Sequence, residues 1–270
     1  GTFLQKGSLP RARAQATQSP QGDGSSASGQ IYTGEDLMVE LKNVDVHYTD
    51  GIKGGVDALN DVNIRINDGE FVFIVGDSGA GKSTLLKLLT REIQPTGGRV
   101  FVNGYNLKKL KNRKLPYFRR SLGMIFQDFR LIPTMTVYEN VAFVLRSTDK
   151  SKKYIRQRVP YVLNLVKLND KAKAYPGQLS GGEQQRVAIA RAFASDPKII
   201  IADEPTGNID PKLSYEIVEL LQDINDCGTT IIMVTHNHDL VKYYGGRIIN
   251  LREGSIAFDG TIEGAIEEGD

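Results

Sequence analysis

The 270-residue chain has no tryptophan, a single cysteine and no long hydrophobic run. One cysteine, Cys227, excludes a disulfide scaffold and is typical of a reducing compartment. Residues 71–75 are among the longest purely apolar runs, far short of the roughly 18 residues that a membrane-spanning helix needs. The net charge is only +2, which excludes a polybasic nucleic-acid coat and an acidic disordered chain. We therefore expect a protein that is soluble by itself or is held at a membrane by a partner.

Composition divides the chain into three parts. Residues 1–37 contain a stretch of Gln, Ser, Gly and Ala that is too polar to form a core, and no apolar segment of a secretory signal. We interpret them as a disordered, vector-derived tail before a natural start at Met38; a native flexible extension is the alternative. Residues 38–260 have a globular pattern, and residues 261–270 form an acidic tail.

The hydrophobic pattern predicts an α/β fold. Segments 39–48 and 59–66 alternate apolar and polar residues, as half-buried antiparallel strands do, and a glycine-rich turn at 50–55 separates them. Segments 70–75, 198–202 and 229–235 are almost purely apolar, which is typical of buried parallel strands between helices. A closing hairpin is expected at 247–258. The sequence thus predicts a parallel sheet, an antiparallel β-subdomain beside it, and an inserted α-helical subdomain at about 128–178.

The strongest local signal follows the first buried strand. It matches G-x-x-x-x-G-K-[ST] and consists of Gly76, Asp77, Ser78, Gly79, Ala80, Gly81, Lys82 and Ser83, followed by Thr84 at the start of a helix. Glycines let backbone N–H groups wrap phosphates, and a helix N-terminus adds a positive dipole. Lys82 is expected to reach the β- and γ-phosphates and Ser83 to bind Mg²⁺. An ordinary glycine-rich turn is the alternative.

Two further motifs carry chemistry. The strand at 199–202 ends in Asp203 and Glu204, so Asp203 can hold a Mg²⁺ water and Glu204 can activate a water nucleophile; a strand entering an acidic loop is the alternative. Residues 179–186 read LSGGEQQR, in which Ser180 and Glu183 have capping-box spacing. Gly181 and Gly182 expose the first N–H groups of a helix, although a well-capped helix without a ligand would look the same.

These three motifs together resemble the signature of ABC-type ATPases, over about residues 39–260. Gln127 resembles the Q-loop glutamine, residues 207–210 resemble the D-loop with Ile209 where Leu is commoner, and His236 resembles the switch histidine. Tyr48 resembles the aromatic residue that stacks on adenine, with His47 as its rival because residues 52–55 lengthen the following stretch. Asp77 departs from the proline of many members.

The resemblance implies ATP and Mg²⁺ as cofactors and a head-to-tail homodimer that ATP holds together. It implies catalytic roles for Glu204, His236, Gln127 and Lys82, and metal ligation by Ser83, Gln127 and Asp203. Nucleotide contacts would come from Tyr48, from residues 76–84, from Asp210 and, in the facing copy, from Ser180, Gly181 and Gly182.

The sequence also suggests a partner. Apolar residues in 128–143 predict a groove for a cytoplasmic helix of a membrane protein, whereas simple packing of the helical insert is the alternative. Residues 126–133, 136–143 and 205–208 are similar to the cell-division members of the family. This similarity implies a peripheral location on the cytoplasmic face of a bacterial membrane and control of cell-wall hydrolases through an integral membrane protein.

Other readings remain open. The ATPases of lipoprotein or macrolide exporters share most of these sequence motifs and the same chemistry. ABC ATPases of DNA or ribosomes carry a long coiled coil or two cassettes, which this sequence lacks, so no nucleic-acid partner is expected. A nucleotide-binding module that never turns over is the remaining alternative. Residues 108–120 hold seven positive charges, for which a solvated face, anionic lipid and nucleic acid are the readings in that order.

Overall fold

The structure is a computed structural model that describes residues 37–49 and 55–261. The predicted tail, apart from Leu37, lies outside the described residues, as do residues 50–54 of the predicted turn and residues 262–270 of the acidic tail. The first described strand begins at Leu37, and the next residue, Met38, is buried.

The element order matches the alternation of strands and helices expected from the sequence. The strands are β1 (Leu37–Tyr48), β2 (Val56–Asn67), β3 (Phe71–Val75), β4 (Gly97–Val102), β5 (Tyr105–Asn106), β6 (Leu122–Ile125), β7 (Ile199–Asp203), β8 (Thr230–Val234), β9 (Arg247–Arg252) and β10 (Ser255–Thr261). The helices are α1 (Lys82–Leu89), α2 (Leu115–Arg120), α3 (Val137–Ser147), α4 (Lys152–Leu165), α5 (Gly181–Phe193), α6 (Pro211–Asp226) and α7 (His238–Tyr244), with short 3₁₀ turns η1 (Asn112–Lys114), η2 (Asn169–Lys171) and η3 (Pro176–Gln178).

The strands form two sheets. A 4-stranded sheet has the order β2-β1-β4-β5 and is antiparallel throughout. A 6-stranded sheet has the order β10-β9-β3-β8-β7-β6, in which only the edge strand β10 is antiparallel. Both predictions of sheet type are confirmed, and the carboxyl ends of β3, β8, β7 and β6 lie along one edge of the large sheet.

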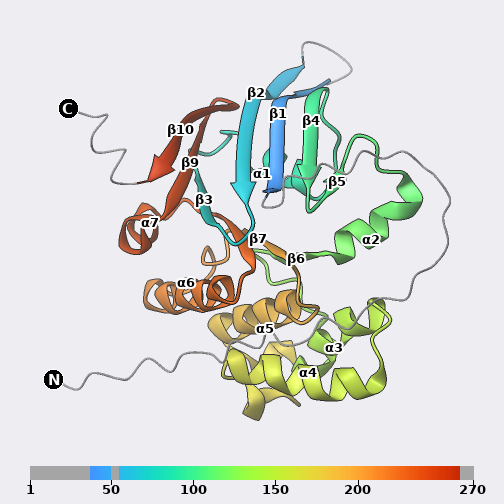
Figure 1. Cartoon of the computed structure of the whole chain (residues 1–270). Coiled ribbons are helices and arrows are strands. Elements are labelled where there is room, and N and C mark those ends of the chain that lie inside the picture. Colours follow the sequence, from blue (N-terminus) through green and yellow to red (C-terminus); the bar gives the residue numbers. More distant parts are fainter. Residues whose placement is uncertain (1–36, 50–54, 262–270) are drawn as a thin grey trace. The chain divides into compact units, whose positions relative to one another are not determined.

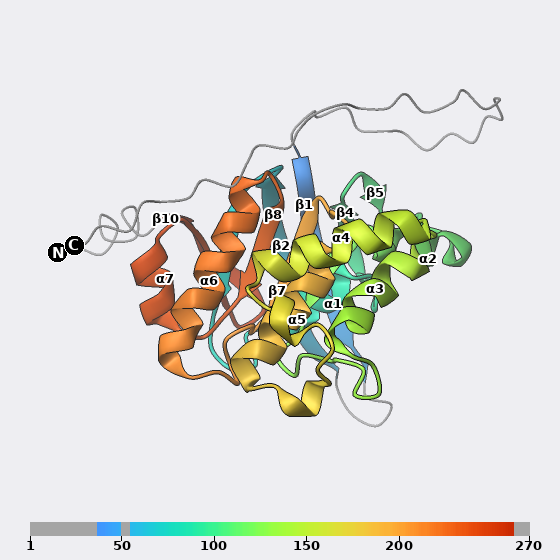
Figure 2. The same ribbon diagram turned by 90° about the horizontal axis from the view of Figure 1, so that it is seen from below.

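The central strands β3, β7 and β8 of the large sheet are buried on both faces, which explains their continuous apolar sequences. Because side chains alternate along a strand, Val72 and Ile74 of β3 join one core cluster, whereas Phe73 and Val75 join the other. The first cluster includes the leucines of α1 and the inner face of β1, β2 and β4. The second is formed with α3 to α7, which lie on the opposite side of the sheet in Figures 1 and 2.

The insert at 128–178 contains α3 and α4, in agreement with its helical pattern. Thr136 begins α3 with a capping box, since its hydroxyl accepts from the Glu139 N–H and the Glu139 carboxylate accepts from the Thr136 N–H. These bonds lower the pKa of Glu139. Val141 and Leu145 of α3 are buried, so most of the apolar pattern of this helix serves packing.

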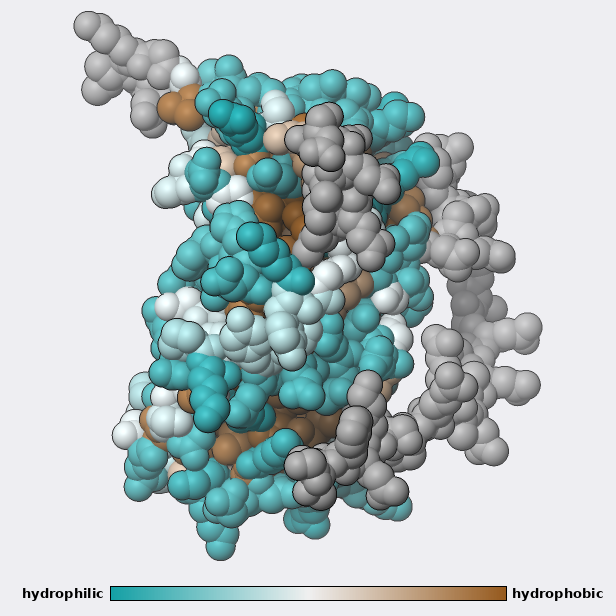
Figure 3. Space-filling view, turned by 90° about the vertical axis from the view of Figure 1, so that its left-hand side faces the viewer, coloured by the Kyte–Doolittle hydropathy of each residue, from teal (hydrophilic) through white to brown (hydrophobic). Residues whose placement is uncertain are grey.

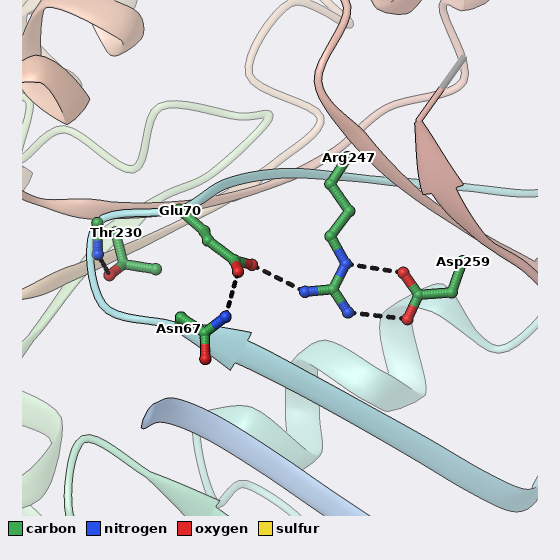
Figure 4. A network of polar contacts seen from close by, with 6 residues as sticks. Asn67, Glu70, Thr230, Arg247 and Asp259 are labelled. Carbon is green, nitrogen blue, oxygen red and sulfur yellow. Dashed lines mark hydrogen bonds and ion pairs between the residues drawn. The ribbon is translucent and has the colours of Figure 1, made fainter. Parts of the chain in front are cut away.

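A polar network fastens the far edge of the sheet (Figure 4). Arg247 in β9 makes two parallel hydrogen bonds to Asp259 in β10, at 2.7 and 2.8 Å, and a third to Glu70 at 2.8 Å, just before β3. Asn67 also donates to Glu70. These carboxylates raise the pKa of Arg247. The network therefore ties β9 and β10 to the start of the strand that leads into the glycine-rich loop.

The face shown in Figure 3 is mainly hydrophilic, and hydrophobic residues show there chiefly in recesses between polar ones. Among the described residues, no helix combines the length and the hydropathy that crossing a membrane would require.

Candidate functional site

The glycine-rich loop connects β3 to α1 in a conformation that its glycines permit. Gly76, Gly79 and Gly81 have φ values of 146°, 83° and 105°, which side chains rarely adopt. A Cβ at Gly76 would lie 2.2 Å from the Leu251 carbonyl oxygen. The Lys82 ammonium donates to the carbonyls of Gly76 and Asp77 at 2.6 and 2.8 Å, so it lies folded over its own loop.

The first turn of α1 opens onto a cavity of about 630 Å³. Its N-cap, Gly81, offers no side-chain acceptor, so the first N–H groups of the helix remain available to an anion. The cavity is lined by Val56, Asp57, Ala58, Gly76, Asp77, Ser78, Gly79, Gly81, Lys82, Ser83, Thr84, Glu204, His236 and His238. The predicted loop thus forms one wall, and this wall suits a phosphate chain.

Tyr48 and His47, the two residues predicted to stack on adenine, lie near the start of β2 and the start of α1 through contacts with Asp57 and Thr84. The Tyr48 hydroxyl lies 3.4 Å from the Thr84 hydroxyl at the start of α1. His47 is instead paired across the strands with Asp57, at 2.6 Å. Neither candidate for stacking lines the cavity itself, but each contacts a residue that does, Tyr48 through Thr84 and His47 through Asp57. Sequence reasoning missed Asp57 and His238 as lining residues, although His238 lies only two positions after His236.

The two carboxylates lie at the carboxyl end of β7, where Asp203 is the last residue of the strand and Glu204 follows it, with His236 against Glu204. The His236 Nδ1 lies 3.0 Å from the Glu204 Oε2. Glu204 has a φ of 45°, and its N–H donates to the Val234 carbonyl at the end of β8. Burial, and secondarily the charge of Glu204, raise the pKa of Asp203. The arrangement gives a carboxylate that can accept a proton beside a histidine at the cavity.

Gln127 lies apart from the cavity. It follows β6, and a Cβ at Gly207 would come 2.8 Å from its Nε2, so the amide lies against Gly207. Asn208 donates to the Gln127 carbonyl at 3.0 Å. The segments predicted as Q-loop and D-loop are therefore in contact, whereas Gln127 and Asp203 are not among the residues that line the cavity.

The chain bends sharply after Gln127. Phe129 and Arg130 have φ values of 59° and 46°. Arg191 of α5 donates to the carbonyl oxygens of both residues, the bond to Phe129 being 2.7 Å long. Burial lowers the pKa of this guanidinium. Sequence reasoning missed Arg191, because no local pattern relates it to a loop 61 residues earlier.

The LSGGE segment starts α5 with the predicted capping box. The Ser180 hydroxyl accepts from the Glu183 N–H at 3.2 Å, and the Glu183 carboxylate accepts from the Ser180 N–H at 2.8 Å. These bonds lower the pKa of Glu183. Asp210 caps α6 by accepting from the Lys212 N–H at 2.9 Å. Neither Ser180, Gly181 and Gly182 nor Asp210 line the cavity of their own chain.

A buried amide connects α5 to the carboxylate loop. Gln185 is fully buried, and its Nε2 donates to the Pro205 carbonyl at 2.7 Å, directly after Glu204. Its Oε1 has no hydrogen-bond partner among the described residues. Sequence reasoning missed this contact, because its only local signal is a polar residue on the inner face of a predicted helix.

The described residues contain no group of three or more His, Cys, Asp or Glu side chains that could hold a metal by themselves.

The site combines a loop that can wrap phosphates with a carboxylate–histidine pair beside it. This combination, together with a glycine-rich helix start elsewhere on the chain, is expected of a cassette that hydrolyses nucleotides. The ABC transporter family model matches residues 59–207, and the chain belongs to this family as an ATP-hydrolysing cassette.

Among individual proteins, the chain is 47% identical over 222 residues to the cell division ATP-binding protein FtsE of Bacillus subtilis, which covers 82% of this chain and 96% of that protein. It is 45% identical over 210 residues to FtsE of Escherichia coli K12, covering 78% and 95%. A solved ATP-binding cassette, a dimer in a post-hydrolysis state bound to ADP and Pi, is 40% identical with a TM-score of 0.75, covering 83% of this chain and 99% of that one.

Proposed function

We propose that the protein is the ATPase subunit of an FtsE-like complex, which dimerises on ATP and changes the conformation of an FtsX-like integral membrane partner. In this proposal it acts at the cytoplasmic face of a bacterial cell membrane and regulates cell-wall hydrolysis during division. Similarity to FtsE proteins over almost their entire length supports this role.

The observation that carries the catalytic part is the 3.0 Å contact between His236 and Glu204 beside the loop cavity. In this proposal Glu204 accepts a proton from an attacking water, and His236 contacts that carboxylate through Nδ1 while its other ring nitrogen faces a γ-phosphate. Lys82, which now donates to two backbone carbonyls, has donors that can turn to phosphate oxygens.

Mg²⁺ would be held by Ser83 and Asp203, with Gln127 as a third ligand after its amide leaves Gly207. When bound, the ion supplies charge neutralisation on the phosphates. Because burial raises the pKa of Asp203, a cation beside this group would stabilise its ionised form.

A second copy would complete the site. Ser180, Gly181 and Gly182 do not line the cavity of their own chain, yet they form a helix start with free donors. In the capping box the Ser180 hydroxyl is an acceptor, and it donates to no other described residue, so its proton could bind a partner's phosphate. The dimeric form of the solved relative supports this pairing.

Replacing Glu204 by Gln tests the catalytic role. We expect the variant to bind ATP and to form stable dimers in size-exclusion chromatography, while steady-state hydrolysis falls about 100-fold or more. Glu219→Gln, a matched change on the exposed face of α6, should leave turnover unchanged. Normal turnover in Glu204→Gln would rule Glu204 out as the base.

Only a few apolar residues of segment 128–143 remain accessible to the proposed membrane partner. Most apolar residues of α3 are buried, but Phe129 and Leu131 are half-buried and Phe143 is 46% exposed. A tagged chain is pulled down from detergent-solubilised cells, and the integral membrane protein that accompanies it is identified. We expect the Phe143→Asp variant to lose this partner while its ATP turnover persists. Tyr161→Asp on α4, which removes an aromatic ring with the same 46% exposure, should retain it. Unchanged capture by Phe143→Asp would refute the groove. A lipoprotein or macrolide permease in the capture would favour the exporter function instead.

A further inference from the structure

The segment that leads into β6 concentrates the positive charge of the chain. Between Ile93 and Gln127 the sequence has no Asp or Glu, yet residues 104–121 carry seven Lys and Arg. Since the whole chain is +2, all its other residues together have a net charge of −5, the difference between +2 and +7. The charge is therefore segregated, which a merely solvated face does not require.

Buried apolar residues anchor this segment to the core, so that most of its cations face outward. Leu107 and Phe118 are buried, and Leu110 and Leu115 pack against the same core cluster. Arg119 donates to the carbonyls of Thr90 and Arg91, at 3.2 and 3.1 Å, and so belongs to the support. The other six cations are exposed, and we call them the basic surface: Lys108, Lys109, Lys111, Arg113, Lys114 and Arg120.

Little within the described part of the chain neutralises the basic surface. None of its six side chains has an ion pair there, and Arg120 instead lies 5.6 Å from the ring centre of Tyr117, which is 65% exposed. Asp196 shares a hollow with Arg120 and Lys198, and it is itself paired with Arg158 at 3.5 Å. The basic surface thus combines six cations that form no ion pair within the described ranges with one exposed aromatic ring, that of Tyr117.

We infer that the basic surface docks on the anionic headgroups of a phospholipid membrane. Clusters of four to eight Lys or Arg are attracted to anionic leaflets, and a tyrosine ring is suited to the membrane–water interface. Single-stranded nucleic acid would need a groove with several stacking rings, whereas the basic surface has one exposed ring. In Figures 1 and 2, α2 lies at the β6 edge of the large sheet, away from α6 and α7.

This inference rests on the proposed peripheral location and specifies how the subunit would be oriented there. α2 runs directly into β6 and then into residues 128–143, the segment proposed to receive the membrane partner. A partner helix in that groove would bring the basic surface toward the same leaflet. Lipid contact would then fix the tilt of the cassette and raise its local concentration near the partner.

The test is co-sedimentation of the purified full chain with vesicles of 70% phosphatidylcholine and 30% phosphatidylglycerol, compared with pure phosphatidylcholine. The variant Lys111→Gln, Arg113→Gln, Lys114→Gln removes three cations of the basic surface. Lys152→Gln, Lys153→Gln, Arg156→Gln removes three exposed cations of α4 and has the same net charge. ATP turnover of each variant reports that the fold is intact.

We expect the wild type to bind the anionic vesicles and not the neutral ones, with affinity that falls as salt rises. Each cation near an anionic leaflet contributes about a five-fold factor, so the basic-surface variant should bind about 100-fold more weakly, and the α4 variant within about three-fold of wild type.

Absent binding, equal binding to neutral vesicles, or an equal loss in both variants would overturn the inference. So would displacement of the chain from vesicles by mixed-sequence RNA at equal phosphate concentration, which would assign the surface to nucleic acid. The vesicles contain no partner, so their failure to bind leaves the FtsX-like partner standing. Loss of partner capture with retained vesicle binding would instead count against the FtsX-like partner and leave the lipid contact standing.

Discussion

The buried amide of Gln185 allows a prediction in which stability and activity separate. Its side chain lies in the core between α5 and the loop after β7, with one hydrogen bond of 2.7 Å to Pro205 and an unpartnered Oε1 among the described residues. The loop that it holds carries Glu204 at a φ of 45°. Removing the amide should free this loop without emptying the core.

The perturbation is Gln185→Met, which keeps the length of the side chain and removes both polar atoms. Eliminating a buried unpaired oxygen stabilises the fold by about 1–3 kcal/mol, and leaving the Pro205 carbonyl unpaired costs about as much. The two effects oppose each other, so we expect the free energy of unfolding to change by less than about 1 kcal/mol, or a Tm shift below about 4 °C.

Catalysis has no such compensation. The loop loses the hydrogen bond that fixes it to α5, and one hydrogen bond of about 1.4 kcal/mol corresponds to a ten-fold loss of kcat. The assays are urea unfolding without nucleotide and steady-state ATP hydrolysis. Gln184→Met is the control, because the Gln184 amide donates to the nearby Leu179 carbonyl at 3.2 Å and has no hydrogen bond to the loop after β7 in the part of the chain that the structure describes. Unchanged kcat in Gln185→Met, or a stability loss above about 3 kcal/mol, would refute this reasoning.

Two further predictions concern charge. Arg247→Met leaves Glu70 and Asp259 without their shared cation, so we expect about 1–2 kcal/mol lower unfolding free energy in urea with unchanged kcat. Arg65→Met, which breaks a pair whose arginine is 72% exposed, should cost about 0.5 kcal/mol or less; equal losses would contradict the role assigned to burial. The pKa of Asp203 is raised in the fold, so its ionised form lowers stability above the ordinary value of 3.8, and this penalty vanishes below that pH. Asp203→Asn should therefore be more stable than wild type at pH 7 without nucleotide, converge with it near pH 3, and lose Mg²⁺-dependent hydrolysis. A lower Tm at pH 7 would contradict the sign.

The chain shows how far local pattern reaches. The loop at 76–83 and the capping box at Ser180 were predictable, because each depends on backbone geometry within a few residues. The alternation of β1 and β2 and the apolar runs of β3, β7 and β8 predicted sheet type, since side-chain period and burial are set strand by strand.

Contacts between distant segments were decided only by the tertiary structure. The sequence placed Glu204 and His236 after strands, but the parallel pairing of β7 with β8 determined their 3.0 Å separation. Gln185 meets Pro205 because α5 packs against the loop after β7, and the Gln127 amide lies against Gly207 instead of the cavity. Local motifs indicate which groups the chemistry requires. Which of these groups are in contact depends on packing between segments 20 to 177 residues apart, and no short-range pattern encodes that packing.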